Sequence, residues 1–366
     1  MTSIFDSLQI TFSGLNLDLM IVLPAIALMG GTVIFLLMAV NALVAVYFER
    51  KVSAFMQDRL GPMEVGILGF KGGKRFWGGI GQTLADAIKL LVKEDILPND
   101  ADRVLMILAP FIIFTGAFLT FIGLPFAENL VISDFNIGVF YIVAMSSVGV
   151  IGIILAGWSS NNKWSLYGAM RAAAQIISYE IPIGLSLLLV VLVAGSLNFG
   201  DIVQWQADNR WFIFHSPFSF LAFFIFFISI VAETNRTPFD IPEAESELVA
   251  GWMTEYSGFR WALFFLSEYA NMLIVSIVAS TVFLGGWLSP LQMFNVLPEA
   301  WLFLDGPTLG LFWVFLKAII LIFVMMWFRW TFPRLRVDQL MYLCWKVFIP
   351  FGLANLFFIS LWELLF

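Results

Sequence analysis

Long runs of apolar residues alternate with short polar segments along most of the chain. Each run approaches the roughly 20 residues that a helix needs to cross the hydrocarbon core of a membrane, whereas a β-barrel would show short segments of alternating polarity. The pattern therefore predicts an all-α polytopic membrane protein, one membrane domain over 1–366 with eight transmembrane helices. The predicted spans are 19–47, 104–124, 137–158, 176–197, 217–231, 261–287, 308–328 and 343–365.

Basic residues gather in the connections that follow the odd-numbered spans. The even-numbered connections hold only Arg210. Because basic residues accumulate on the cytoplasmic side, the odd connections are predicted to be cytoplasmic and both termini to lie on the non-cytoplasmic side. The acidic N-terminal segment resembles neither a transit peptide nor a secretory signal, so we expect the first span to insert the chain.

The first cytoplasmic connection has helical periodicity of its own over residues 76–93. One face carries apolar residues and the other carries polar ones, a pattern typical of a helix at the membrane surface. The apolar face is formed by Trp77, Ile80, Leu84, Ile88 and Leu91, and the polar face by Gln82, Asp86, Lys89 and Lys93. From the pattern alone, an interfacial anchor explains this segment as well as a functional role does.

The composition narrows the chemistry that the chain can perform. Hydrophobic residues make up 61% and charged residues 12%, about half the charged share of a soluble domain. With Cys344 and His215 as the only residues of their kinds, the chain cannot assemble an intrachain disulfide, a Cys-ligated iron–sulfur cluster, a typical zinc site or a bis-histidine haem. We expect no metal site and no bound cofactor, so any electrons must arrive on a partner.

Ionisable residues within the fourth, sixth and seventh predicted spans are unexpected. Glu180 is placed at the start of the fourth span, Glu268 inside the sixth, and Lys317 in the middle of the seventh. Such groups cost about 2.5–3.5 kcal/mol each to insert, so they face protein or water and indicate function. A buried ion pair that locks two helices is the alternative for each. Together with the loop described next, they favour a polar path into the membrane.

The cytoplasmic loop 232–260 is unexpectedly acidic for its side of the membrane. Its first part, residues 232–252, holds Arg236 among five acids, Glu233, Asp240, Glu243, Glu245 and Glu247.

Local patterns in this loop predict a short helix from Ile241 to Trp252, capped by Asp240 with Glu243 at capping-box spacing. That helix would put Glu243 and Glu247 on one face with Glu245 turned away, so that the pair titrates as a coupled group. A solvated acidic loop is the alternative.

Several stretches of the chain resemble one protein family. They are AETNRTPFDIPEAESELVAG, EYSGFRWALFFLSEYAN, ERKVSAFMQDRLGP, LADAIKLLVKEDI, MRAAAQIISYE and WFRWTFPRLRVDQLMYLCWK. They extend from the first span to the eighth and are similar to the quinone-site membrane subunit of respiratory complex I, the NuoH/NdhA family. The resemblance implies a proton-translocating NADH (or ferredoxin):quinone oxidoreductase, in which this subunit forms the quinone tunnel while soluble partner subunits carry the iron–sulfur clusters and flavin.

The resemblance also implies roles for individual residues. The quinone tunnel would involve Glu49, Arg50, Arg59, Arg171 and Arg236. Proton transfer or coupling would involve Asp86, Glu180, Glu233, Asp240, Glu243, Glu245, Glu247 and Glu268, and Lys317 stays a possible intramembrane charge. A capping role alone would suffice to explain Asp240. Two stretches depart from the family pattern: residues 66–79 are longer and more basic, and Trp252–Met253 replaces a smaller aromatic residue followed by Asn or His.

Three alternatives stay open. The first is the related membrane subunit of an energy-converting hydrogenase, the second a stand-alone ion transporter, and the third a scaffold that anchors the soluble arm. The expected partners are the other membrane-arm subunits, the soluble iron–sulfur and quinone-site subunits, quinone and lipid, with no nucleic acid. A bacterial inner membrane is favoured over an organellar or thylakoid membrane.

Overall fold

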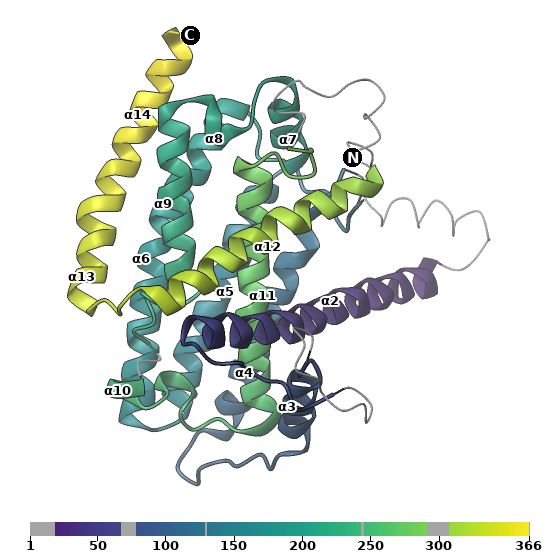
Figure 1. Ribbon diagram of the computed structural model, residues 1–366, viewed down its shortest axis with the longest axis vertical. Coiled ribbons are helices and arrows are strands. Elements are labelled where there is room, and N and C mark those ends of the chain that lie inside the picture. Colours follow the sequence, from purple (N-terminus) through teal and green to yellow (C-terminus); the bar gives the residue numbers. More distant parts are fainter. Residues whose placement is uncertain (1–18, 67–77, 129, 243–244, 291–306, 366) are drawn as a thin grey trace.

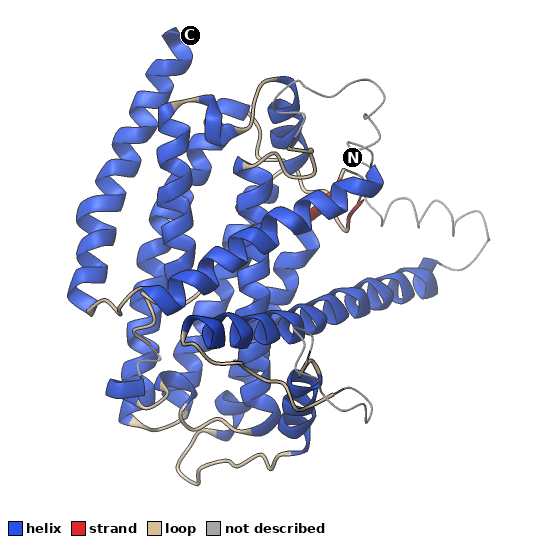
Figure 2. Cartoon of the chain, viewed as in Figure 1, coloured by secondary structure: helices blue, strands red, loops and turns tan. Residues whose placement is uncertain are grey.

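Helices form nearly all of the regular structure in the computed structural model, which describes residues 19–66, 78–128, 130–242, 245–290 and 307–365 (Figure 2). The helices are α2 (Leu19–Met56), α3 (Gly81–Val92), α4 (Arg103–Thr120), α5 (Gly138–Ser159), α6 (Lys163–Ala194), α7 (Phe199–Asp208), α8 (Phe212–His215), α9 (Pro217–Glu233), α10 (Glu245–Leu248), α11 (Gly258–Phe283), α12 (Pro307–Thr331), α13 (Val337–Tyr342) and α14 (Ile349–Leu365). One antiparallel pair, β1 (Pro125–Ala127) and β2 (Leu130–Val131), lies between α4 and α5.

Within the described residues, seven helices are long and apolar enough to cross a membrane. The apolar α9 is the eighth candidate, and its 17 residues reach the lower end of the usual length. The predicted spans are thus confirmed as apolar helices in an all-α polytopic membrane protein. The last span is a continuous helical segment in which the π-helical turn η5 (Leu343–Phe348) joins α13 to α14.

The fourth span begins well before the residue predicted from hydropathy. Asn162 caps α6 by accepting a hydrogen bond from the Trp164 amide, and the helix ends at Gly195, whose φ of 71° is the left-handed conformation that glycine adopts readily. Glu180 was predicted to lie at the start of the fourth span, but the helix extends back through the polar stretch before the apolar run. Glu180 lies near the middle of α6.

Residues predicted to lie on opposite sides of the membrane occupy opposite ends of the helix bundle. In Figure 1, α7, α8 and the end of α14 lie at the top, and α3 and α10 lie at the bottom. α6, α9 and α14 stand nearly upright in this view, whereas α2 and α12 cross it obliquely. The buried core centres on α11, in which Tyr269, Met272 and Ile277 are at most 3% exposed.

The surface helix predicted over 76–93 is present as α3, although its first residues lie outside the described part of the chain. α3 contacts α2 and α11. Its apolar residues Leu84, Ile88 and Leu91 are 44%, 53% and 62% exposed. In the isolated chain this stripe faces away from the bundle, as expected of a helix that lies on lipid or on another protein.

Candidate functional site

A buried group of charged side chains ties four segments together below the acidic loop. Arg236, from the loop after α9, donates from Nη1 to both carboxylate oxygens of Glu49 on α2, at 2.9 and 3.1 Å. Its Nη2 lies 2.9 Å from Oε1 of Glu268 on α11. The Tyr269 hydroxyl donates to Glu49 at 2.5 Å, and Arg329 of α12 also donates to Glu49. We call these five residues the Arg236 cluster.

The cluster is almost closed to solvent, and its formal charges balance. The side chains of Arg236 and Glu49 are 2% and 7% exposed, whereas that of Arg329 is 34% exposed. Two arginines face two carboxylates, which is the condition under which buried charges are tolerated. Burial alone would lower the pKa of the Arg236 guanidinium. The negative charges of Glu268 and Glu49 outweigh the effect of burial and raise this pKa well above its usual value. Arg236 is therefore a permanent cation.

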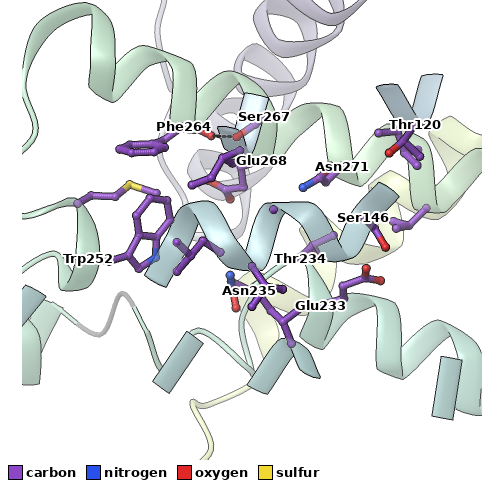
Figure 3. A pocket seen from close by; sticks show the side chains of 18 residues that line it. Thr120, Ser146, Glu233, Thr234, Asn235, Trp252, Phe264, Ser267, Glu268 and Asn271 are labelled. Carbon is purple, nitrogen blue, oxygen red and sulfur yellow. Dashed lines mark hydrogen bonds between the residues drawn. The ribbon is translucent and has the colours of Figure 1, made fainter. Parts of the chain in front are cut away.

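A cavity of about 70 Å³ lies on the other side of Glu268. Figure 3 shows Glu268, Ser267 and Asn271 of α11 on one wall and Glu233, Thr234 and Asn235 on the opposite wall. Ser146 of α5 and Thr120 of α4 complete its polar lining. The cavity joins Glu268 to Glu233, and its volume and polar groups are sufficient for a few water molecules.

A second and smaller cavity, about 30 Å³, lies between Glu233 and Glu180. It shares Ser146 and Glu233 with the first cavity, but most of its other lining residues are apolar, among them Ile142, Ile183 and Phe226. Glu180 Oε1 is buried and has no hydrogen-bond partner within the described part of the chain. The three carboxylates Glu268, Glu233 and Glu180 thus follow one another across the bundle, separated first by a larger cavity with several polar lining groups and then by a smaller, mostly apolar one.

The prediction of a continuous helix from Ile241 to Trp252 is wrong. Among the described residues of this stretch, the helical elements are α10, four residues long, and the 3₁₀ turn η2 (Gly251–Met253). Val249 and Gly251 adopt φ values of 66° and 55°, which are incompatible with a continuous right-handed helix.

Asp240 does not cap a helix in this loop, because its carboxylate forms an ion pair with Arg334 at 3.1 Å. Burial is the largest influence on this acid and raises its pKa from 3.8 to about 6, although Arg334 and Arg329 oppose the shift.

Contacts to neighbouring helices hold the acidic loop in place. Gln175 of α6 donates to the carbonyls of Ala232 and Phe239 at 2.7 and 2.8 Å. Gly168 of α6 packs against Gly251 so closely that a Cβ at Gly168 would lie 2.6 Å from the Gly251 Cα. α6 is therefore the main support of the loop.

The remaining predicted loop acids divide into one that is described and two that are not. Glu247 is 60% exposed and pairs with Arg171 at 2.7 Å, so Arg171 lies at the rim of the loop rather than in the Arg236 cluster. Glu243 lies outside the described residues, as does the side chain of Glu245. The predicted pairing of Glu243 with Glu247 on one helical face lacks the continuous helix that it required.

The predicted residues near the amphipathic helix form a separate, more exposed group. Arg50 donates to Asp86 at 2.5 Å and so ties α2 to α3, with the two side chains 42% and 35% exposed. Gln82 donates to the same carboxylate at 3.0 Å. Arg59 is exposed and donates to Gln57. Arg50 therefore lies at the surface beside α3 and Arg59 at the surface just after α2, both outside the buried cluster.

Lys317 has a structural role that explains its position within a span. Its Nζ donates to the backbone carbonyls of Leu284, Gly286 and Leu288 at 2.7, 2.8 and 2.8 Å. It also lies 4.3 Å from the centroid of the Trp211 ring. Carbonyls just beyond the end of a helix have no intrahelical donor, and Lys317 supplies donors for those that follow α11.

Sequence patterns alone missed several residues of the site. Tyr269 follows Glu268 directly, and Arg329 ends α12, yet neither has a local pattern that predicts contact with Glu49. Ser146 and Ser147 lie in an apolar run where serine is common. Within the described residues, no group of three or more His, Cys, Asp or Glu side chains is placed to hold a metal ion.

Comparisons with known proteins identify the family of the chain. A family model described as NADH dehydrogenase matches residues 29–360. The H subunit of the NADH-quinone oxidoreductase of Chlorobaculum tepidum is 53% identical over 87% of both chains. The proteins of the same name from Bacteroides thetaiotaomicron and a Geobacillus species are 48% and 50% identical, over 89% and 90% of this chain and 87% and 92% of theirs.

The family model extends over nearly all of the described helices. Its match includes most of α2 and all of α6, α9, α11 and α12, which carry or flank the Arg236 cluster and the three carboxylates. The chain therefore belongs to the NuoH family, the membrane subunits of the NADH-quinone oxidoreductase complex, and functions as one subunit of that enzyme among the others of complex I.

Proposed function

We propose that this subunit forms the membrane end of the quinone tunnel and the first part of a carboxylate path that couples quinone reduction to proton translocation. The observation that carries the proposal is the sharing of one arginine. Arg236 pairs with Glu49 and with Glu268, and Glu268 also lines the larger cavity that leads to Glu233. A change at one side of Arg236 therefore alters the electrostatic surroundings of the other.

The Arg236 cluster supplies the fixed part of the quinone site. Because Arg236 Nη1 donates to both carboxylate oxygens of Glu49, this pair holds α2 and the loop after α9 together. Arg50 is exposed beside α3, Arg59 is exposed just after α2, and Arg171 is at the rim of the loop, where soluble partner subunits and a quinone head group would meet this chain. Asp86 positions Arg50 at that entrance.

The coupling step acts through the pairing of Arg236 with Glu268. When quinone reduction or movement changes the charge near Glu49 and Arg236, the guanidinium pairs more or less strongly with Glu268. A change in this pairing is passed on to Glu233 through the cavity that both carboxylates line. Asp240 and Arg334 connect the same loop to the segment before α13 and make its position sensitive to charge.

The remaining expectations about the assembly fit this role. The chain would be embedded in a bacterial inner membrane, beside other membrane-arm subunits. Soluble subunits that hold the flavin and the iron–sulfur clusters would deliver electrons from NADH or ferredoxin to the quinone. The chain itself supplies permanent charges, carboxylates and the walls of the site, and quinone is its substrate.

The proposal is tested in the assembled enzyme with Glu233→Gln and Glu268→Gln, with quinone reduction and proton translocation measured separately in proteoliposomes. Both variants should retain assembly and lose most proton translocation. The matched control is Glu363→Gln, which removes a carboxylate paired with His215 at 2.6 Å in the part of α14 farthest from the site. Wild-type proton-to-electron ratios in both carboxylate variants would refute the path.

A further inference from the structure

Two adjacent serines on α5 face the two carboxylates that border the apolar cavity. The Ser146 hydroxyl is within hydrogen-bonding reach of Glu233, and Figure 3 shows the two side chains pointing toward each other. The Ser147 hydroxyl is within reach of Glu180. Neither serine belongs to the carboxylate path as proposed above. Their location matters because the cavity between these carboxylates is mostly apolar and apolar cavities stay dry.

Both hydroxyls have a second hydrogen-bond partner, and it is the same one. Ser146 Oγ and Ser147 Oγ donate to the carbonyl oxygen of Val143 at 2.9 and 3.0 Å. A serine hydroxyl has a single proton but two acceptor lone pairs. Each hydroxyl can therefore donate either to the Val143 carbonyl or to its carboxylate, but not to both at once.

The charge on each carboxyl group decides between these two partners. An ionised carboxylate only accepts hydrogen bonds, so the serine must donate to it. A protonated carboxyl group donates its own proton to the serine oxygen, and the hydroxyl then turns to the Val143 carbonyl. One rotation of the hydroxyl thus provides a hydrogen bond in both charge states, without a water molecule.

We propose that Ser146 and Ser147 are positioning residues that stabilise the charged and the neutral forms of Glu233 and Glu180 in turn. The shared Val143 carbonyl links the two hydroxyls within one turn of α5, between one carboxylate on α9 and another on α6. The inference rests on the proposed carboxylate path and adds to it the groups that replace water at its apolar step.

The ionisable groups that face the two serines come from three helices. They are Glu180 of α6, Glu233 of α9 and, across the larger cavity, Glu268 of α11. α4, which packs along α5, contributes Thr120 to this region, and its single ionisable side chain, Arg103, lies at its first residue. A shift in pH dependence on removing a hydroxyl therefore reports on these carboxylates.

The test uses the holoenzyme with Ser146→Ala, Ser147→Ala and the conservative Ser146→Thr and Ser147→Thr. Loss of a hydrogen bond to a charged group favours the neutral acid. The pH dependence of proton translocation should therefore shift upward by about one pH unit in each alanine variant. The infrared band of the protonated Glu233 carboxyl group can be identified because Glu233→Gln lacks it. In Ser146→Ala this band should persist to higher pH. Threonine, which keeps the hydroxyl, should restore the wild-type profile.

Ser186→Ala is the matched control, because Ser186 is a buried serine that donates to the carbonyl four residues earlier, Pro182, at 2.9 Å; its profile should not move. If an alanine variant does not assemble, Ser146→Cys and Ser147→Cys keep the volume with a weak donor and should give the same shift.

Wild-type pH profiles and carboxyl bands in the alanine or cysteine variants would overturn the inference about the serines. If Glu233→Gln still lost proton translocation, the proposed carboxylate path would nevertheless stand. Normal pumping in both Glu233→Gln and Glu268→Gln would instead refute the path itself.

Discussion

Replacing Glu49 with glutamine should leave Arg236 and Arg329 with one carboxylate, Glu268, between them. Removing one partner of a buried ion pair costs about 3–5 kcal/mol when the remaining charge has no compensation. Here Arg236 keeps Glu268 at 2.9 Å, and Arg329, whose side chain is 34% exposed, can turn toward solvent. We therefore expect Glu49→Gln to lower the free energy of local opening around the cluster by about 2–3 kcal/mol.

The double variant Glu49→Gln/Arg329→Gln tests the charge balance directly. It leaves one arginine and one carboxylate, so the cluster is again neutral. If charge balance governs the cost, the double variant should be more stable than the sum of the single effects by at least about 1 kcal/mol.

Hydrogen exchange followed by mass spectrometry on the assembled enzyme measures this quantity, because local opening is defined even where global unfolding of a multisubunit complex is not. In Glu49→Gln, amides of 236–241 should exchange roughly 30- to 150-fold faster. Asp86→Asn is the control, since its pair with Arg50 is half exposed, and such pairs contribute less than about 1 kcal/mol. Unchanged exchange in Glu49→Gln, or strictly additive effects in the double variant, would refute the reasoning.

Three further outcomes follow from the contacts described above. Burial raises the pKa of Asp240 from 3.8 to about 6, so its loop should be most stable at low pH. The loop should lose on the order of 3 kcal/mol of local stability as pH rises from about 4 to about 6. Asp240→Asn should abolish this pH dependence, as measured by hydrogen exchange. Lys317→Met removes donors from three carbonyls and should destabilise the end of α11 by more than about 3 kcal/mol, whereas a conservative change at exposed Lys89 should not alter exchange at 280–288. Gly168→Ala would force a Cβ to 2.6 Å from the Gly251 Cα and should displace the loop, lowering quinone reductase activity at least tenfold, while alanine at Gly184, which has nothing within 4 Å, should leave activity unchanged.

Hydropathy predicted the spans because it measures contact with lipid, and for the same reason it misplaced some of their ends. α6 begins at Lys163 rather than at 176, since a helix continues where it packs on protein even after its surface becomes polar. The failed helix at Ile241–Trp252 has a different cause. The positive φ values of Val249 and Gly251 are imposed by packing against α6, which no pattern within the loop records.

Some residues of the site could be named from the sequence, but their geometry could not. Intramembrane acids such as Glu180 and Glu268 are conspicuous because their insertion is costly. In contrast, the pairing of Arg236 with Glu49 joins residues 187 positions apart and depends on how α2 crosses the bundle. Lys317 was conspicuous for the same reason as the acids, yet its three carbonyl partners make it a helix-terminating group. Composition identifies unusual residues, while only tertiary contacts assign their roles.

The π-helical turn Leu343–Phe348 lets α13 and α14, the two parts of the last span, take different rotations about the helix axis. Tyr179 donates to the Leu340 carbonyl at 3.0 Å and fixes α13 against α6, while Asn355 donates to the Phe218 carbonyl at 2.9 Å and fixes α14 against α9. A π turn accommodates an extra residue relative to an α-helix, and one residue corresponds to about 100° of rotation and about 1.5 Å of rise. Deleting one residue here would therefore turn the exposed Phe351 and Phe357 away from lipid, so the extra residue is what allows both ends of one helix to fit their different neighbours.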